Sequence, residues 1–318
     1  MLISVVIPAY QSADTIEGCI RSVLEQTVNN PFEVIVVDDG STDGTGHICD
    51  CLADSDYRVV VIHQPNSGRS VARWNGVERA VGQWVTFIDA DDALPSSALA
   101  DLTESITPNP YPSTQGYTPD IVLGNGYTLP GEQRKLIPMS EFRHLAVRAE
   151  GTIGVPWGSL YRRELLTKEL FDLPREIYNG EDYIFWLRLV FSTNSPVSVV
   201  YKKVYNKGKE HTSNCFRWTA DYCYRLNEYR KAAIPAEDHQ IYLADMLNDR
   251  IVNLFATTLY QERNEWEGSQ FYNDILNDML ATGRTFTLKQ RLYLALPARW
   301  LRRLKVCLCR GIKRVSPT

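Results

Sequence analysis

The stretch Trp84-Val85-Thr86-Phe87-Ile88-Asp89-Ala90-Asp91-Asp92 places three carboxylates directly after an apolar run. A short apolar run bounded by polar residues is typical of a buried strand. Asp89 and Asp91 are two positions apart, so on an extended chain their side chains point the same way. Converging carboxylates repel each other unless a cation lies between them, and hard divalent cations prefer oxygen ligands. The stretch predicts a strand that ends at a metal site; a polar loop is the alternative.

The segments around this stretch repeat the same design. A second β-branched run, Glu33–Val37, ends in Asp38-Asp39-Gly40-Ser41-Thr42-Asp43-Gly44-Thr45, where glycines permit a tight turn and Ser41, Thr42 or Asp43 can cap a helix. Strand and helix alternate four times within about the first 100 residues, which predicts an α/β fold with a mostly parallel sheet. The other expected elements are strands over Met1–Pro8 and Arg58–His63 and helices near Asp14–Gln26 and Val71–Ala80.

Five segments of the chain follow one another in this order: Ser4-Val5-Val6-Ile7-Pro8-Ala9-Tyr10, Val36–Thr45, Gly68-Arg69-Ser70-Val71-Ala72-Arg73, Phe87–Asp92 and Gly180-Glu181-Asp182. In order and spacing, these segments together resemble the inverting family 2 glycosyltransferases. The resemblance implies the GT-A fold, a Rossmann-like, mostly parallel sheet flanked by helices, over residues 1–215. It also implies a nucleotide-diphosphate sugar as donor, with a UDP-sugar favoured, a divalent metal (Mn²⁺ or Mg²⁺), and transfer with inversion to an acceptor hydroxyl.

The resemblance implies a role for each matched residue. Asp39 matches the acidic residue that contacts the donor base, while Asp89 and Asp91 match the Asp-X-Asp motif, which serves the ribose and the metal. Asp182 matches the general base, which takes the proton of the acceptor hydroxyl. From the residues alone, Glu181 and Asp182 also suit a helix N-terminus, and the two interpretations are compatible. The remaining residues assigned to nucleotide binding are Pro8, Ala9, Tyr10, Gly68, Arg69, Arg73 and Ala90.

Three further residues are assigned less directly. His211 matches a histidine that completes the metal site or touches the diphosphate in some family members, and a solvated loop histidine is the alternative. Trp157 resembles the segment that closes over the acceptor, although a core tryptophan fits its sequence context equally well. Glu181 is assigned to the acceptor side with it.

Two positions depart from the family pattern. Trp74 stands where the family usually has Asn, and Asn75 follows it, so a role of that Asn in supporting the donor loop is either shifted by one position or lost. Gln11 follows Tyr10 where Asn is commoner. Neither departure touches the carboxylates.

The composition limits the classes of protein that the chain can belong to. At 318 residues and 44% hydrophobic content, it is long enough for one large domain with an appendage. Seven cysteines without a Cys-X-X-Cys pair indicate neither zinc nor a disulfide framework and favour a cytosolic compartment. The N-terminus lacks the features of a signal peptide, and no apolar run approaches the ~20 residues that span a bilayer.

The C-terminal third has a different pattern. Residues 216–318 are expected to form a helical subdomain, since apolar residues recur at helical spacing from Ile241 to Phe255. Residues 280–318 contain ten Lys and Arg and no Asp or Glu. With Trp300 and Leu301 on an apolar stripe and Arg302 and Arg303 off it, this tail predicts a basic amphipathic helix at an anionic membrane surface; a helix docked on the protein is the alternative. Nothing in the chain is typical of nucleic-acid recognition.

The sequence therefore predicts a metal-dependent inverting glycosyltransferase acting on a saccharide or lipid-linked saccharide. Surface polysaccharide or lipid-linked oligosaccharide synthesis is the expected context, at the inner, cytoplasmic face of a membrane. The alternatives are a nucleotidyltransferase that makes sugar nucleotides and a non-catalytic sugar-nucleotide sensor. The sugar, the linkage and a homodimer contact stay open.

Overall fold

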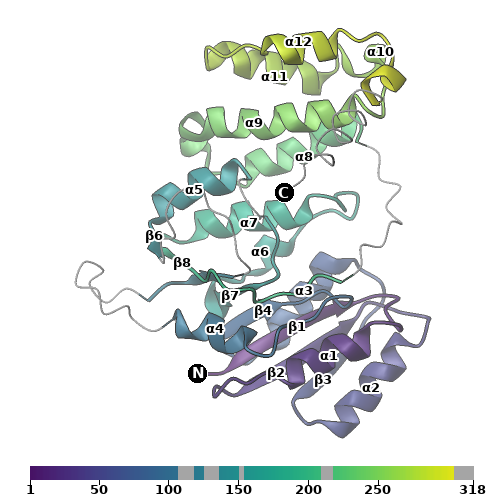
Figure 1. Ribbon diagram of the computed structural model, residues 1–318, viewed down its shortest axis with the longest axis vertical. Coiled ribbons are helices and arrows are strands. Elements are labelled where there is room, and N and C mark those ends of the chain that lie inside the picture. Colours follow the sequence, from purple (N-terminus) through teal and green to yellow (C-terminus); the bar gives the residue numbers. More distant parts are fainter. Residues whose placement is uncertain (107–117, 125–135, 150–153, 209–217, 304–318) are drawn as a thin grey trace, which may run out of the picture. The chain divides into compact units, whose positions relative to one another are not determined.

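The computed structural model describes residues 1–106, 118–124, 136–149, 154–208 and 218–303 (Figure 1). The chain divides into two compact units, Met1–Glu210 and His211–Thr318. The domain boundary expected at residue 215 lies in the segment 209–217, outside the described residues. The assignment of residues 1–215 and 216–318 as domains therefore stays a prediction.

The first unit contains one eight-stranded sheet with the strand order β3-β2-β1-β4-β7-β5-β8-β6. Its strands are β1 (Ile3–Ala9), β2 (Phe32–Asp38), β3 (Val59–His63), β4 (Trp84–Phe87), β5 (Ile121–Leu123), β6 (Leu136–Ile137), β7 (Ser159–Arg162) and β8 (Val197–Val199). The helices are α1 (Ile16–Leu24), α2 (Thr45–Ser55), α3 (Arg69–Arg79), α4 (Ala98–Glu104), α5 (Met139–Val147), η2 (Arg163–Leu165), α6 (Lys168–Phe171) and α7 (Glu181–Ser192).

The first four strands have the topology of a nucleotide-binding fold. β1 pairs in parallel with β2 on one side and with β4 on the other, and β2 pairs in parallel with β3. β7 runs antiparallel to both β4 and β5. The chain thus reverses its direction of strand addition at β1, and ligands of open α/β sheets bind beyond the carboxyl ends of the strands at such a switch point. The predicted alternation of strand and helix is confirmed here.

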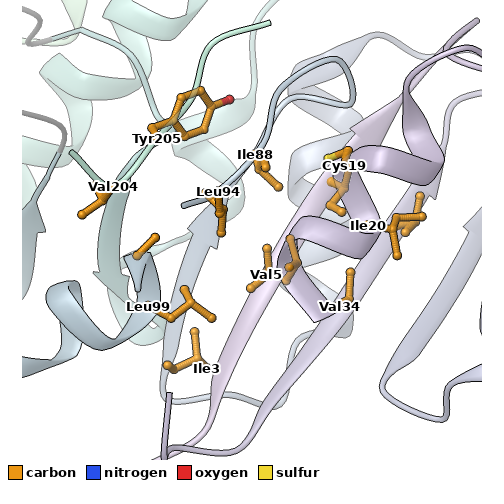
Figure 2. Packing of buried hydrophobic residues seen from close by; sticks show 14 of the residues in the cluster. Ile3, Val5, Cys19, Ile20, Val34, Ile88, Leu94, Leu99, Val204 and Tyr205 are labelled. Carbon is orange, nitrogen blue, oxygen red and sulfur yellow. The ribbon is translucent and has the colours of Figure 1, made fainter. Parts of the chain in front are cut away.

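Alternate residues of β1 and β2 face two different cores, as the period of a strand requires. Val6 and Ile35 belong to a cluster with residues of α3, α5 and α7, whereas Val5 and Val34 belong to a cluster with residues of α1, α2 and α4. Figure 2 shows part of the second cluster, with Cys19 and Ile20 of α1 close to the strands. The sheet is therefore the middle layer between two sets of helices (Figure 1).

Several local details differ from the sequence predictions. The stretch from Val197 to Tyr205 is a regular strand only over Val197–Val199. The N-cap of α2 is Gly44, in a left-handed conformation, and no side chain caps the helix there. Asp43 instead accepts hydrogen bonds from the backbone N–H and the hydroxyl of Thr45. α7 begins at Glu181, as the acidic pair at this position predicts.

The second unit is helical in its described part. Its core contains the side chains of Leu247, Leu254, Trp266 and Ile275. Ile241, which begins the predicted apolar stripe, is exposed. The helices are α8 (Ala220–Ala232), η3 (Ala236–Asp238), α9 (His239–Thr257), α10 (Arg263–Trp266), α11 (Gln270–Ala281) and α12 (Leu288–Leu294).

The described start of the basic tail does not have the predicted amphipathic pattern. Arg302, expected on the solvated side, is 0% exposed, whereas Trp300, expected on the apolar stripe, is 62% exposed. The Arg302 guanidinium donates to the backbone oxygens of Thr258, Leu296 and Gln261. This segment is thus docked within its own unit at Arg302. Residues 304–318, which carry the rest of the tail, lie outside the described residues. Among the described residues, none of the helices has the length and apolar character needed to cross a membrane.

Gly76 and Gly18 offer a test of how tightly α3 packs on the sheet. A Cβ at Gly76 would lie 2.3 Å from Cγ1 of Val6, whereas a Cβ at Gly18 in α1 would meet nothing within 4 Å. Alanine is favoured over glycine inside a helix by about 1 kcal/mol, but overpacking a core costs about 1–3 kcal/mol. We expect Gly76→Ala to lower the melting temperature and Gly18→Ala to leave it unchanged or raise it. Equal effects of the two changes in thermal unfolding would contradict this packing.

Candidate active site

The candidate site lies where β1, β2 and β4 end. Ala9 of β1 is paired with Asp38 of β2, and Val6 is paired with Phe87 of β4. The residues that follow these strands therefore emerge at the same edge of the sheet, and they include Tyr10, Asp39 and Asp89. This edge is the switch point of the topology.

Asp39 is 4% exposed and fixes the loop that leads into α3. Its carboxylate accepts hydrogen bonds from Nε2 of Gln64 at 2.7 Å and from the backbone N–H groups of Ser67 and Gly68 at 2.7 and 2.8 Å. Gly68 has a φ of 94°, which favours glycine. Asn75 donates to Oε1 of Gln64 at 2.6 Å, so Asn75 supports this loop from the position after Trp74.

Gln11 joins the loop after β1 to the loop after β2. Its backbone N–H donates to the Ser41 hydroxyl, and its side-chain amide exchanges hydrogen bonds with Thr42. Its φ is 51°, a conformation in which Asn is favoured over Gln. The hydrogen bonds to Ser41 and Thr42 offset this strain. Tyr10, beside it, exposes its ring.

The guanidinium of Arg73 connects two of the predicted site carboxylates. Its Nη1 donates to Oδ1 of Asp182 at 2.6 Å and its Nη2 to Oδ1 of Asp89 at 3.0 Å. Burial alone would lower the pKa of Arg73, but Asp182 and Asp89 outweigh it and raise this pKa above its usual value. The charged guanidinium thereby ties together α3, the end of β4 and the start of α7, over 109 residues of sequence between Arg73 and Asp182.

Asp91 and Asp92 are adjacent but differ in their surroundings. Asp92 is buried and accepts hydrogen bonds from the Tyr205 hydroxyl at 2.5 Å and the Gly208 N–H at 2.6 Å. Burial raises the pKa of Asp92, and these two hydrogen bonds oppose that rise. The Asp91 carboxylate is exposed and makes no hydrogen bond or ion pair with another described residue. A Cβ at Gly208 would lie 2.0 Å from the backbone oxygen of Asp91, so only glycine fits there.

A divalent metal fits the oxygen donors of this edge. Asp91 offers an unpaired carboxylate, and one oxygen of Asp89 is free of the Arg73 contact. Within the part of the chain that the structure describes, there is no group of three or more His, Cys, Asp and Glu side chains arranged to hold a metal. The described residues would thus supply one or two ligands, Asp91 and Asp89, and further ligands would come from elsewhere. His211, predicted as a further ligand, lies outside the described residues.

Glu181 is the first residue of α7 and its side chain is buried. Nε of Arg69 lies 3.2 Å from Oε1 of Glu181. Burial and the neighbouring Asp182 raise the pKa of Glu181 to about 7, against the opposing charge of Arg69. A carboxyl that exchanges its proton near neutral pH therefore lies next to the predicted base.

Trp157 stacks on Tyr205, with ring centroids 4.3 Å apart and an angle of 18° between the planes. Figure 2 shows Tyr205 near Ile88 and Leu94, with its hydroxyl at the outer end. That hydroxyl accepts a hydrogen bond from the backbone N–H of Asp89 at 3.1 Å. One face of the Trp157 ring is therefore covered by a residue that holds the acidic turn in place.

A cavity of about 330 Å³ opens between the start of α3 and the segment that precedes α7. Of the predicted site residues, Gly68, Arg69 and Glu181 line it, whereas Trp157 does not. Its other lining residues, not identified from the sequence, are Ser67, Ser70, Val71, Leu173, Pro174, Arg175, Ile177 and Tyr178.

The structure brings Asp89, Arg73 and Asp182 into direct contact and joins Asp39 to Gly68. Pro8, Ala9 and Ala90 lie at the same strand ends, and their side chains carry no polar group. Sequence reasoning missed Gln64, Asp92, Tyr205 and Arg175. The available signals were a polar residue directly after the β3 run for Gln64 and the position before Gly180-Glu181-Asp182 for Arg175. Tyr205 had no such signal.

Solved structures of similar fold support the GT-A assignment. The structure of S. aureus TarS 1-349 in complex with UDP-GlcNAc has a TM-score of 0.56 and 19% identity, covering 90% of this chain and 93% of that one. The mannosyltransferase PcManGT from Pyrobaculum calidifontis, in complex with GDP-Man and Mn²⁺, has a TM-score of 0.52 and 18% identity, covering 92% and 78%. The predicted GT-A fold is confirmed.

Curated relatives are glycosyltransferases. EpsJ of Bacillus subtilis (strain 168) is 33% identical over 58% of this chain and 54% of its own length. GlyA of Streptococcus pneumoniae serotype 4 is 26% identical over 91% of this chain and 41% of its own length. The chain thus spans about half the length of these relatives or less. The family model described as glycosyl transferase family 2 matches residues 4–170, which is more than half of the chain and ends before Glu181 and Asp182. The chain belongs to glycosyl transferase family 2.

Proposed function

We propose that this chain is a metal-dependent, inverting glycosyltransferase that moves a sugar from a nucleotide-diphosphate donor to an acceptor hydroxyl. The observation that carries the proposal is the contact of buried Arg73 with both Asp89 and Asp182. Direct displacement needs the donor and the base on opposite sides of one carbon, and a fixed link between their residues supports that orientation. Family membership supports the reaction class, and the UDP-GlcNAc complex of TarS makes a UDP-sugar the favoured donor.

On the donor side, we assign the nucleotide to the strand ends. Pro8, Ala9 and Tyr10 would pack around the base, since Tyr10 exposes its ring there. Asp39 would form the base site by fixing the loop that contains Gly68. Asp89 and Ala90 would lie along the ribose and diphosphate, with Arg69 at the start of α3. Arg73 would act through Asp89, because both its Nη atoms are already bound to carboxylates.

The metal, Mn²⁺ or Mg²⁺, would be held by Asp91 with Asp89 and, by the family pattern, His211. The exposed carboxylate of Asp91 supports this role, because hard cations bind such oxygens. When bound, the cation supplies stabilisation of the negative charge that develops on the leaving diphosphate. PcManGT, with GDP-Man and Mn²⁺, supports Mn²⁺ as the first ion to assay.

On the acceptor side, Asp182 would take the proton of the attacking hydroxyl. The acceptor oxygen forms a bond to C1 of the sugar while the bond from C1 to the diphosphate oxygen breaks, and that electron pair leaves with the nucleoside diphosphate. Arg73 would keep the Asp182 carboxylate aimed at the acceptor. Glu181 would contact the acceptor in the neighbouring cavity, and Trp157 would offer its ring face away from Tyr205.

Residues 1–215 would form the catalytic domain, and residues 216–318 the helical region that meets a membrane. The exposed side chains of Leu288, Leu292 and Trp300, in a segment without acidic residues, support peripheral contact with an anionic surface. Synthesis of a surface polysaccharide or lipid-linked oligosaccharide at the inner face of the membrane would fit this arrangement.

Asp182→Asn tests the base. Asparagine can still accept the hydrogen bond from Arg73 but cannot take a proton, so we expect transfer to fall about 10²- to 10⁴-fold with donor affinity nearly unchanged. The measurement is release of nucleoside diphosphate from UDP-, GDP- and dTDP-sugars with Mn²⁺, alongside the dissociation constant of the donor. The control is Asp54→Asn, an exposed position of α2. Normal turnover by Asp182→Asn would show that another group is the base.

Asp91→Asn and Asp92→Asn separate metal binding from structure. Asp91 has no described partner, so its change should weaken metal-dependent donor binding and leave the melting temperature within about 1 °C. Asp92 accepts from Tyr205 and Gly208, and an asparagine would point its N–H at one of these donors. We expect Asp92→Asn to lower the free energy of unfolding by about 1–3 kcal/mol. Thermal unfolding and Mn²⁺ titrations of donor binding are measured for both variants. If Asp91→Asn lowers stability and Asp92→Asn weakens metal-dependent donor binding, the assignment of Asp91 is overturned.

Glu181→Gln tests the raised pKa of Glu181. The pKa of Glu181 is about 7 in the folded chain and near its ordinary value of 4.5 in the unfolded chain, so the folded chain keeps a proton that the unfolded chain loses. Stability of the wild type should therefore fall as pH rises from about 4.5 to 7, which amounts to at most about 3 kcal/mol. Glutamine does not titrate. The variant should match the wild type at pH 5 and exceed it at pH 8, whereas Glu78→Gln, on the exposed side of α3, should follow the wild type at both. If the melting temperatures of all three proteins change with pH in the same way, the raised pKa of Glu181 is refuted.

A further inference from the structure

The cavity between α3 and the segment before α7 has a size and a composition suited to a small ligand. Its volume of about 330 Å³ lies at the lower end of the ~300–1,000 Å³ that small-molecule sites occupy. Its apolar lining includes Leu173, Pro174 and the exposed ring of Tyr178. Apolar and aromatic surfaces of this kind suit the C–H faces of sugar rings.

The charged residues of this cavity are two arginines and one glutamate. Arg69 is paired with Glu181, at 3.2 Å. Arg175 is exposed, and its guanidinium donates only to the neutral Asn66, to the side-chain and the backbone oxygens. No carboxylate lies within ion-pair distance of Arg175 among the described residues. The cavity thus carries an excess of positive charge, although the formal net charge of the chain is −4.

The geometry of Arg175 leaves hydrogen-bond donors for a ligand. A guanidinium has five N–H donors in a planar fork that matches the oxygens of a carboxylate or a phosphate. The two contacts to Asn66 fix the orientation of the fork and use only part of these donors. An arginine that is held in place but not neutralised is suited to bind an anion, because little side-chain freedom is lost on binding.

The surroundings of Glu181 strengthen the positive character of the cavity below neutral pH. Glu181 is faced by Arg69 and Arg73 of α3 and by Asp182 of its own helix. When Glu181 is protonated, it no longer neutralises Arg69, and the positive charge of the cavity rises. When Glu181 is ionised, it neutralises Arg69, and Arg175 remains the positive charge that is available to an anion.

We infer that this cavity is the acceptor subsite and that it selects a saccharide carrying a negative charge, a carboxylate or a phosphate monoester, bound by Arg175. The inference rests on the proposed function, since Glu181 in the cavity wall directly precedes Asp182. A neutral saccharide would leave the Arg175 charge without a partner. Arg175 is thereby assigned a role in acceptor specificity, separate from the donor residues at the strand ends.

The test compares three probes that share a pyranose ring: glucose, glucuronate and glucose 6-phosphate. Their dissociation constants are measured by calorimetry on the full chain with Mn²⁺ and UDP present, for the wild type, Arg175→Gln and Arg79→Gln. Arg79→Gln is the control, because it removes the same charge from an exposed position of α3 outside the cavity. UDP binding is measured in parallel for each protein.

We expect the wild type and Arg79→Gln to bind at least one anionic probe about fivefold or more tightly than glucose, since a hydrogen-bonded charge pair at a partly exposed site supplies at least that difference. The comparison of glucuronate with glucose 6-phosphate shows whether a carboxylate or a phosphate monoester is preferred. Arg175→Gln should lose most of this preference and keep its affinity for UDP.

Three results would overturn the inference. The first is that the wild type shows no preference for either anionic probe, which includes no binding of any probe; the second is that Arg175→Gln and Arg79→Gln have equal effects. The third is that Arg175→Gln loses as much affinity for UDP as for the probes, which would place Arg175 at the donor. Absence of UDP binding in the wild type would instead refute the proposed function itself.

Discussion

The buried guanidinium of Arg73 is the contact on which the site depends. Its ion pairs with Asp89 and Asp182 join the end of β4 to the start of α7 through a residue of α3. A buried charge is tolerated only when it is paired, and removing one partner of such a pair typically costs about 3–5 kcal/mol. Arg73 also has a buried Nε without a hydrogen-bond partner among the described residues, so its side chain depends on the two carboxylates even more. The three elements therefore keep one arrangement, in which the proposed donor and base residues stay aligned.

Around this contact, each carboxylate is distinguished by what it already binds. Asp39 accepts three hydrogen bonds and fixes a loop, and Asp92 accepts two and fixes the chain at Tyr205 and Gly208. Asp91 is exposed and has no described partner. The carboxylates of Asp39 and Asp92 are thus used to fix the chain, whereas that of Asp91, one of the proposed metal ligands, is not. Because Asp92 fixes the acidic turn, the neighbouring Asp91 carboxylate can be held in position and still be open to the proposed metal.

Much of the fold could be predicted because its signals are local. The β-branched runs that became β1 and β2 are bounded by turn residues, so periodicity alone gives their positions and hence the edge where Asp39 and Asp89 lie. The contacts of Arg73 with Asp182, of Tyr205 with Asp92 and of Arg175 with Asn66 join residues about one hundred positions apart. No local pattern contains such pairs. The predicted position of Arg302 was wrong for the same reason: helical spacing placed it on a solvated face, whereas three backbone oxygens of the same unit bind its guanidinium.

The donor side of the proposed site could be predicted from the sequence better than the acceptor side, and the reason is physical. Parallel strands bring their carboxyl ends to one edge, so residues at the donor side are positioned by the sheet itself. In the proposed arrangement, the acceptor side is formed by the segment from Leu173 to Tyr178, which is irregular and is held by contacts such as that of Arg175 with Asn66. Loops on a rigid scaffold can change without disturbing the core. A fold of this kind can therefore keep one donor chemistry while the acceptor changes, and under the inference above the charge of a single loop residue, Arg175, would alter which acceptor is bound.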